Sequence, residues 1–192
     1  MNHAPLAPQS TPPPPHWRQR LVQRLRTHLP TLLMLLAIVV GAHLWHTRHL
    51  PRGVVPDATV QLASGETMPL SRWRALHPGQ PVALHFWAEW CPICRTEEHS
   101  VTRVQRDWPV LTVAMQSGAA PKVLQVLAQR ALPWTTAVDT NGALARSMGV
   151  QSVPALLVLD ASGQLRAASV GYTSEIGMRL RLRWAQAMSG WQ

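Results

Sequence analysis

Apolar runs alternate with stretches of helical periodicity over most of the chain. Runs at 82–87 and 110–115, apolar apart from His85 and Thr112, predict buried strands, because a strand covered on both faces shows no polar alternation. Residues 120–131 carry apolar side chains at helical spacing and predict a helix. Strands that alternate with helices predict an α/β fold in which helices cover both faces of a mixed sheet.

Hairpins and a last helix complete this pattern. Residues 60–70 alternate around Ser64-Gly65, and residues 155–159 and 164–170 flank a second turn, so each pair predicts a hairpin. Ser174 is expected to cap a terminal helix ending near residue 188, in which three large apolar side chains recur at helical spacing. Those three are Ile176, Leu180 and Trp184. Short elements are also expected at residues 71–76 (capped by Ser71), 136–138 and 143–148.

The first fifty residues differ from the rest. Residues 1–28 are rich in proline and arginine and predict a disordered tail, whereas residues 29–46 are almost wholly apolar and predict one transmembrane helix. Arginine is more frequent before this segment than after it, which predicts a cytoplasmic N-terminus. A cleaved signal peptide ending near 40–42 is the alternative. Residues 47–58 are then a linker and 59–190 one folded domain.

Charge does not favour nucleic acid as a partner. The chain carries 18 Lys and Arg against 9 Asp and Glu, and the first 52 residues hold six of the arginines and no acid. The excess therefore flanks the apolar segment, as a membrane topology signal does. No basic stripe interleaved with aromatic residues occurs in the folded part, so nucleic-acid binding is not expected.

The two cysteines stand together in Cys91-Pro92-Ile93-Cys94, directly after a predicted buried strand and at the predicted start of a helix. Proline suits the first turn of a helix, where the backbone N–H has no partner. A thiolate at a helix N-terminus faces unpaired N–H groups and the positive end of the helix dipole, which stabilise it. The spacing predicts a reactive dithiol with Cys91 as the nucleophile and Cys94 as the resolving thiol.

Residues 86–94, with the pattern Phe-Trp-Ala-Glu-Trp-Cys-x-x-Cys, resemble the active-site signature of the thioredoxin family. The resemblance covers about residues 59–188 and implies a thioredoxin fold with a redox-active Cys91–Cys94 disulfide. By the same resemblance, Pro154 has a cis peptide bond beside Cys91, and the Val153 backbone is exposed to a client strand. With its apolar segment, the chain is similar to membrane-anchored bacterial proteins of the TlpA/ResA type and to the thioredoxin-like protein of the copper-sensitivity-suppressor system.

Further residues are expected to support the dithiol. Trp90 is expected in the wall of the site, and Pro92 and Ile93 contribute to its redox potential. His85 stands where thioredoxins proper carry a buried acid, so it is either a proton acceptor or a packed core residue. Glu97 matches an acid that helps a cysteine ionise in TlpA/ResA-like proteins, and a solvent-exposed position is its alternative.

The sequence thus predicts a protein-disulfide oxidoreductase in the bacterial inner membrane, with its domain in the periplasm. By resemblance it is a reductase of client proteins, supplied by a transmembrane electron donor and needing no cofactor or metal. A disulfide-forming oxidase of the same fold is one alternative. A copper- or zinc-handling protein that uses Cys91, Cys94 and nearby histidines is the other. His43, His46 and His49, which recur every three residues at the end of the apolar segment, are a separate candidate site for a soft metal, and interfacial histidines without a metal are the alternative.

Overall fold

The computed structural model describes residues 28–38, 40–41 and 53–189. The chain divides into two compact units, residues 1–42 and 43–192, which we treat separately. In the first unit, residues 28–38 and 40–41 are helical. Among the described residues, no helix combines the length and apolarity needed to cross a bilayer. Residues 1–27 of the predicted tail, part of the predicted anchor and the three histidines at 43, 46 and 49 lie outside the described residues.

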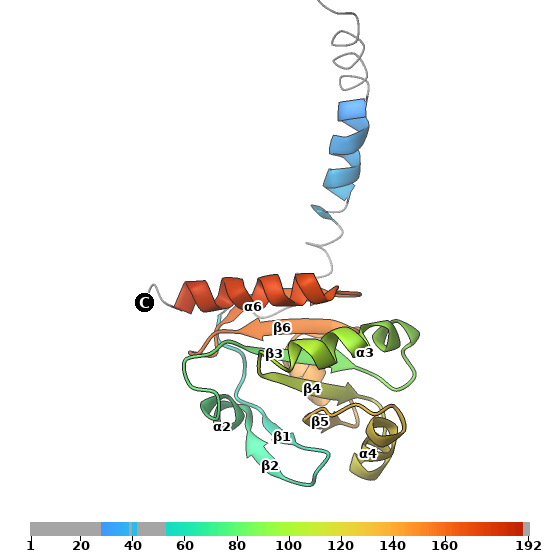
Figure 1. Ribbon diagram of the computed structural model, residues 1–192, viewed down its shortest axis with the longest axis vertical. Helices are drawn as coiled ribbons and strands as arrows, with labels where there is room; N and C mark the ends of the chain where they lie inside the picture. The colour runs from blue at the N-terminus through green and yellow to red at the C-terminus, as the bar shows by residue number, and fades with distance from the viewer. Residues whose placement is uncertain (1–27, 39, 42–52, 190–192) are drawn as a thin grey trace, which may run out of the picture. The chain divides into compact units, whose positions relative to one another are not determined.

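A five-stranded mixed sheet forms the centre of the second unit (Figure 1). Its order is β5-β4-β3-β6-β7, in which β3, β4 and β5 run parallel while β6 pairs antiparallel with both β3 and β7. The sheet strands are β3 Val82–Trp87, β4 Val110–Met115, β5 Thr136–Asp139, β6 Ala155–Leu159 and β7 Leu165–Val170. The predicted mixed sheet and the two predicted buried strands are confirmed.

Five helices cover the two faces of this sheet. The helices are α2 Leu70–Ala75, α3 Pro92–Val104, α4 Ala120–Gln129, α5 Ala143–Ser147 and α6 Glu175–Ser189. Successive side chains of a strand point to opposite faces, and β3 divides its residues accordingly. Leu84 and Phe86 pack in one cluster with residues of α2 and α5, whereas Ala83 and Trp87 pack in the other with residues of α3, α4 and α6. The thioredoxin-like layers are therefore as expected.

One edge of the sheet is covered beside β5, and the other only at the start of β7. An antiparallel hairpin of β1 Thr59–Gln61 and β2 Thr67–Pro69 lies beside β5, where Leu62 forms a bridge with Ala137. At the other edge, Val54 forms a bridge with Gln164, next to the start of β7. An unpaired strand edge can bind another chain, so these additions protect β5 and the first residue of β7 from such pairing. The first hairpin was predicted from its turn; its contact with β5 was not.

The start of α2 differs from the prediction. The N-cap residue is Pro69, which makes no side-chain capping bond, and Ser71 lies within the helix. The Ser71 hydroxyl and N–H instead donate to the Asp57 carboxylate at 2.6 and 2.7 Å. These two bonds hold the pKa of Asp57 below its ordinary value. The predicted cap was wrong because a carboxylate from the preceding segment, and not the serine, satisfies the first turn.

Helix α6 begins as predicted and packs by a different face. Ser174 accepts a hydrogen bond from the Gly177 N–H at 3.2 Å, as a capping serine does. The residues that α6 buries are Met178, Leu182 and Ala185. The apolar row recognised in the sequence lies in solvent: Ile176, Leu180 and Trp184 are 72%, 62% and 59% exposed. Two apolar rows run along this helix, and periodicity alone does not say which one meets the sheet.

The predicted turn between β6 and β7 is organised by one buried carboxylate. Asp160 accepts hydrogen bonds from the hydroxyl and N–H of Ser162 and from the Gln164 N–H, and it forms an ion pair with Arg166 at 2.6 Å. Burial raises the pKa of Asp160, but these donors outweigh it and hold that pKa below its ordinary value. The charged form of Asp160 therefore stabilises the folded state.

The second unit carries a complete core of its own. Every buried residue of the two clusters lies between Val55 and Ala185. A domain with its own hydrophobic core has what independent folding requires. A fragment of residues 53–192 is therefore expected to fold alone, and the experiments below use it.

Candidate active site

Helix α3 begins at the two cysteines. Cys91 is the N-cap residue, Pro92 occupies the first turn, and the Cys94 N–H donates to Cys91 Sγ at 3.2 Å. The two cysteines form a disulfide, with their Cα atoms 5.3 Å apart. The sulfur thus takes the place of the oxygen that usually caps a helix, at the end where backbone N–H groups have no other partner. A negative charge on Cys91 Sγ would be stabilised by the same N–H group and by the helix dipole.

The two cysteines are buried, whereas the two residues between them are exposed. Cys91 and Cys94 are 4% and 2% exposed, so the two differ little in exposure. By contrast, Pro92 is exposed and Ile93 is 52% exposed. The short Pro-Ile connection therefore forms an apolar rim, and the sulfur atoms lie just beneath it.

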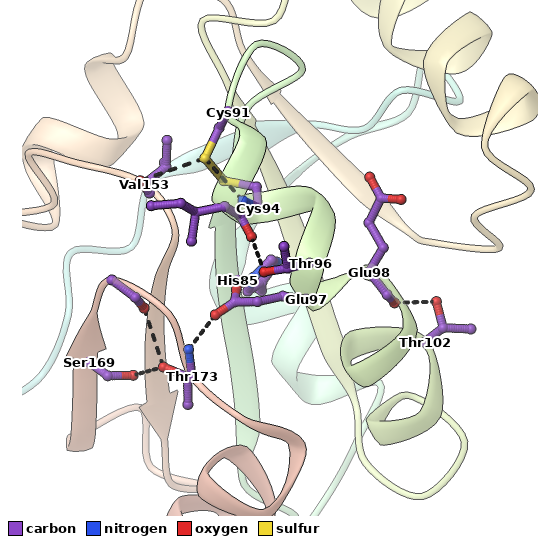
Figure 2. Close-up of polar contacts among 12 residues, drawn as sticks. His85, Cys91, Cys94, Thr96, Glu97, Glu98, Thr102, Val153, Ser169 and Thr173 are labelled. Carbon is purple, nitrogen blue, oxygen red and sulfur yellow. Dashed lines mark hydrogen bonds and ion pairs between the residues drawn. A yellow bond between two sulfur atoms is a disulfide. The ribbon is translucent and has the colours of Figure 1, made fainter.

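A loop before β6 lies against Cys91. The Val153–Pro154 peptide bond is cis, as the resemblance implied. The Val153 carbonyl oxygen is 3.8 Å from Cys91 Sγ (Figure 2), and the Pro154 carbonyl accepts a hydrogen bond from the Gly171 N–H at 2.8 Å. The loop is thereby held between the disulfide and the chain that follows β7. In the reduced state, the Cys91 thiol would have the Val153 carbonyl as a nearby acceptor.

Two tryptophans of the motif have different positions. Trp90 is 61% exposed, and its indole N–H donates to the Gln116 carbonyl at 3.2 Å, which ties it to the loop after β4. Trp87 is 1% exposed and packs edge-on against Trp134, with ring centroids 5.5 Å apart. Trp90 therefore belongs to the surface beside the dithiol, as expected, and Trp87 belongs to the core.

A buried acid–histidine pair joins β3 to α3. His85 Nε2 lies 2.9 Å from a carboxylate oxygen of Glu97, and both side chains are 1% exposed. The second carboxylate oxygen of Glu97 accepts a hydrogen bond from the Thr173 N–H, just before α6 (Figure 2). The solvent-exposed alternative for Glu97 is wrong. His85 and Glu97 were each singled out in the sequence, but neither their contact nor the part of Thr173 was foreseen.

The other side of the His85 ring is apolar. Its Nδ1 atom is buried and has no hydrogen-bond partner among the described residues. Trp134 meets the ring edge-on at 6.2 Å, and its own indole N–H donates to Thr102 on α3 at 3.0 Å. Trp134 comes from the segment before β5, and nothing in the sequence signalled its position.

The turn before the dithiol is tied to α3 through one arginine. Arg130 forms an ion pair with Glu98 at 2.8 Å and donates to the Glu89 carbonyl at 3.1 Å. The Glu89 N–H donates to the Ser117 hydroxyl at 2.9 Å. Residues of α3, of the end of α4 and of the loop after β4 thus position the turn that delivers Cys91. In the described part of the chain, no three His, Cys, Asp or Glu side chains gather closely enough to hold a metal ion.

The mixed sheet, the cysteine pair at a helix N-terminus and the cis-proline beside it define a thioredoxin-like protein. A family model described as the AhpC/TSA family matches residues 51–168. The match includes the strand, the cysteine pair and the cis-proline loop. The chain belongs to this family.

Individual relatives agree with that assignment. The chain is 29% identical over 140 residues to a thioredoxin-like protein of Haemophilus influenzae, and the aligned region covers 70% of this chain and 81% of the relative. It is 24% identical over 152 residues to the thiol:disulfide interchange protein DsbE of Escherichia coli, covering 72% and 82%. A crystal structure of a putative DsbE from Chlorobium tepidum superposes with a TM-score of 0.62 and 25% identity, over 71% of this chain and 99% of that one. The chain is a thiol–disulfide oxidoreductase of the thioredoxin-like kind.

Proposed function

We propose that the chain is a membrane-anchored periplasmic reductase that transfers electrons to client proteins through Cys91 and Cys94. The observation that carries the proposal is the Cys91–Cys94 disulfide at the N-terminus of α3, with the Cys94 N–H directed at Cys91 Sγ. A redox centre needs two thiols that exchange a disulfide with little backbone movement and a nucleophile that ionises readily. The short loop and the helix N-terminus meet both needs.

The reaction is a two-electron exchange in two steps. The Cys91 thiolate attacks one sulfur of a client disulfide, so that the client S–S bond breaks, a mixed disulfide forms, and the second client sulfur leaves as a thiolate. Cys94, as a thiolate, then attacks Cys91 Sγ and releases the first client sulfur. The client is reduced to a dithiol and the protein is left with the Cys91–Cys94 disulfide. A dithiol donor must reduce that disulfide before another turnover.

The buried pair beneath the site is suited to take the proton of the resolving thiol. Cys94 and Glu97 are three residues apart on α3, both on its buried face, so their side chains lie on the same side of the helix. Glu97 in turn contacts His85 at 2.9 Å. Because Cys94 is 2% exposed, water has little access to its proton. We assign proton transfer to Glu97, with His85 as its positioning residue.

The rim around Cys91 is where a client would bind. Ile93 and Trp90 are exposed on one side of the disulfide, and Val153 lies on the other. A client segment between them would place its cysteine next to Cys91 and its backbone beside Val153. The rim carries no charged residue of its own at 92 or 93, which favours clients with apolar or locally unfolded segments.

The location and the direction of electron flow rest on the sequence. Residues 29–46 are proposed as the anchor, between a cytoplasmic tail at 1–28 and a linker at 47–58, with the domain at 59–190 in the periplasm. The resemblance to tethered reductases supports reduction of clients, with electrons from a transmembrane donor. Protease treatment of intact spheroplasts tests this topology: a tag after Gln192 should be digested, and protection of that tag would refute it.

The redox midpoint of the 53–192 fragment tests the direction. Equilibration in dithiothreitol or glutathione buffers should give a value near about −270 mV, as in thioredoxin. A value near about −120 mV would instead identify an oxidase. No reversible transition would refute the redox proposal altogether and return attention to metal binding.

Trapping tests the roles of the two cysteines. Cys94→Ala leaves the nucleophile without its resolving partner, so mixed disulfides with clients should accumulate in periplasmic extracts and disappear on reduction. Cys91→Ala is the matched control and should trap far less. Equal trapping by both variants would contradict the assignment of Cys91 as the nucleophile.

A further inference from the structure

The outer face of α6 is apolar along its length, although it has no partner among the described residues. Ile176, Leu180 and Trp184 stand four residues apart and are 72%, 62% and 59% exposed. We name these three residues the α6 stripe. Residues at this spacing form one continuous row on a helix. An exposed apolar row on a folded domain marks an interaction site, because scattered single residues are the usual pattern.

The stripe does not belong to the packing of the domain. Helix α6 packs on the sheet through Met178 and Leu182, which are 1% and 0% exposed, and Figure 1 shows the helix lying along the β6 side of the sheet. The buried row and the stripe therefore occupy different faces of one helix. A helix that needed only to close the core would carry polar residues on its outer face.

Arginines border the stripe on both sides. At 100° per residue, Arg183 falls beside Ile176 on one side, and Arg181 falls beyond Trp184 on the other. The single acid of α6, Glu175, is already engaged by Arg103 and Arg179 at 2.6 and 2.9 Å. The outer face of α6 is therefore apolar in the middle and positively charged at its borders.

We infer that the α6 stripe binds the surface of an anionic lipid bilayer. A helix with an apolar row, a tryptophan and flanking arginines can lie in the interface plane, where the apolar row enters the acyl boundary and arginines reach the phosphates. Arg181 and Arg183 have long side chains suited to that contact, and the indole of Trp184 suits headgroup depth. The charge at the borders favours a lipid phosphate surface over an uncharged protein groove. This inference goes beyond the proposed redox function and does not depend on it.

Vesicle co-sedimentation of the 53–192 fragment tests the inference without the proposed anchor. The fragment should bind vesicles containing about one-third phosphatidylglycerol and bind phosphatidylcholine vesicles much more weakly. Arg181→Gln with Arg183→Gln should weaken binding about 25-fold, because each arginine near an anionic surface contributes about fivefold. Leu180→Ser with Trp184→Ser should weaken it more than about tenfold on both compositions.

Matched controls distinguish binding through the α6 stripe from nonspecific binding to vesicles. Leu76 is 63% exposed and Arg106 is exposed, and neither lies on α6, so Leu76→Ser with Arg106→Gln should leave vesicle binding unchanged. Circular dichroism should show that all variants fold, and their redox midpoints should match the wild type, which keeps this test separate from that of the redox function. Absent vesicle binding, or equal loss in the control variant, would overturn the inference. So would self-association of the fragment that the stripe variant abolishes, since the stripe would then be a protein interface.

Discussion

The buried contact between His85 and Glu97 makes a sharp prediction about stability. Glu97→Ala removes a carboxylate that accepts from His85 Nε2 at 2.9 Å and from the Thr173 N–H. Both remaining groups would be buried without a partner, at about 1–3 kcal/mol each. Adding the two unpaired groups, we expect a loss of about 2–6 kcal/mol. Against a typical stability of about 5–15 kcal/mol, this is a large effect.

Glu97→Gln separates charge from shape. The amide oxygen can still accept from the Thr173 N–H, and the amide group can face His85 Nε2, so the variant should lose only about 1 kcal/mol. His85→Leu and the double variant complete a mutant cycle. Because the two side chains touch, their effects should couple by about 0.5–3 kcal/mol.

Urea unfolding of the oxidised 53–192 fragment at pH 7 measures these differences, provided that the m-values agree. Glu98→Ala is the matched control, one residue along the same helix. Its ion pair with Arg130 is only partly buried, with side chains 17% and 16% exposed, and should contribute less than about 1 kcal/mol. If Glu97→Ala costs no more than Glu98→Ala, the buried pair does not stabilise the fold as argued here.

Three further predictions concern packing, pH and the site. Leu182→Ala should cost about 2–5 kcal/mol because Leu182 is 0% exposed, whereas Ile176→Ala on the outer face should change the unfolding free energy by less than about 0.5 kcal/mol. The lowered pKa of Asp160 stabilises the fold above the unfolded value of about 3.9, so Asp160→Asn should be destabilising at pH 7 and approach the wild type as the pH falls below about 4. Urea midpoints across pH check both, and an unchanged gap at low pH would contradict the Asp160 argument. Trp90→Phe loses its bond to the loop after β4 but keeps an aromatic rim, so insulin reduction should slow only modestly, while fluorescence reports the loosened loop.

Local patterns were enough to predict most of the sheet and the cysteine pair. The strand predicted at 82–87 agrees with β3, because a run of six residues is too short for a typical helix and lies between turn residues. The helix after the motif begins at Pro92 as predicted and ends at Val104, where the chain turns into the loop before β4. Such boundaries depend on the packing of the next element and not on the helix itself.

The contacts that complete the site lie beyond local patterns. Glu97 is 12 residues from His85 and 76 from Thr173, so its three-way contact exists only after β3, α3 and the start of α6 have been placed. Which face of α6 points outward is likewise decided only when the helix packs against the sheet. Two apolar rows at helical spacing are equally good in the sequence, and only the sheet decides between them.

The partly covered edges of the sheet limit where a client can pair with it. The hairpin lies beside β5 and residues 53–55 lie beside the start of β7, so an extended peptide could join the sheet only along the rest of β7. A client that binds next to the disulfide would instead be recognised at the loop that carries Val153, over a few residues and close to the sulfur. Recognition of that kind depends on how easily a short stretch around the client cysteine can be drawn away from its own fold. Selectivity would then follow the local flexibility of the client more closely than its sequence.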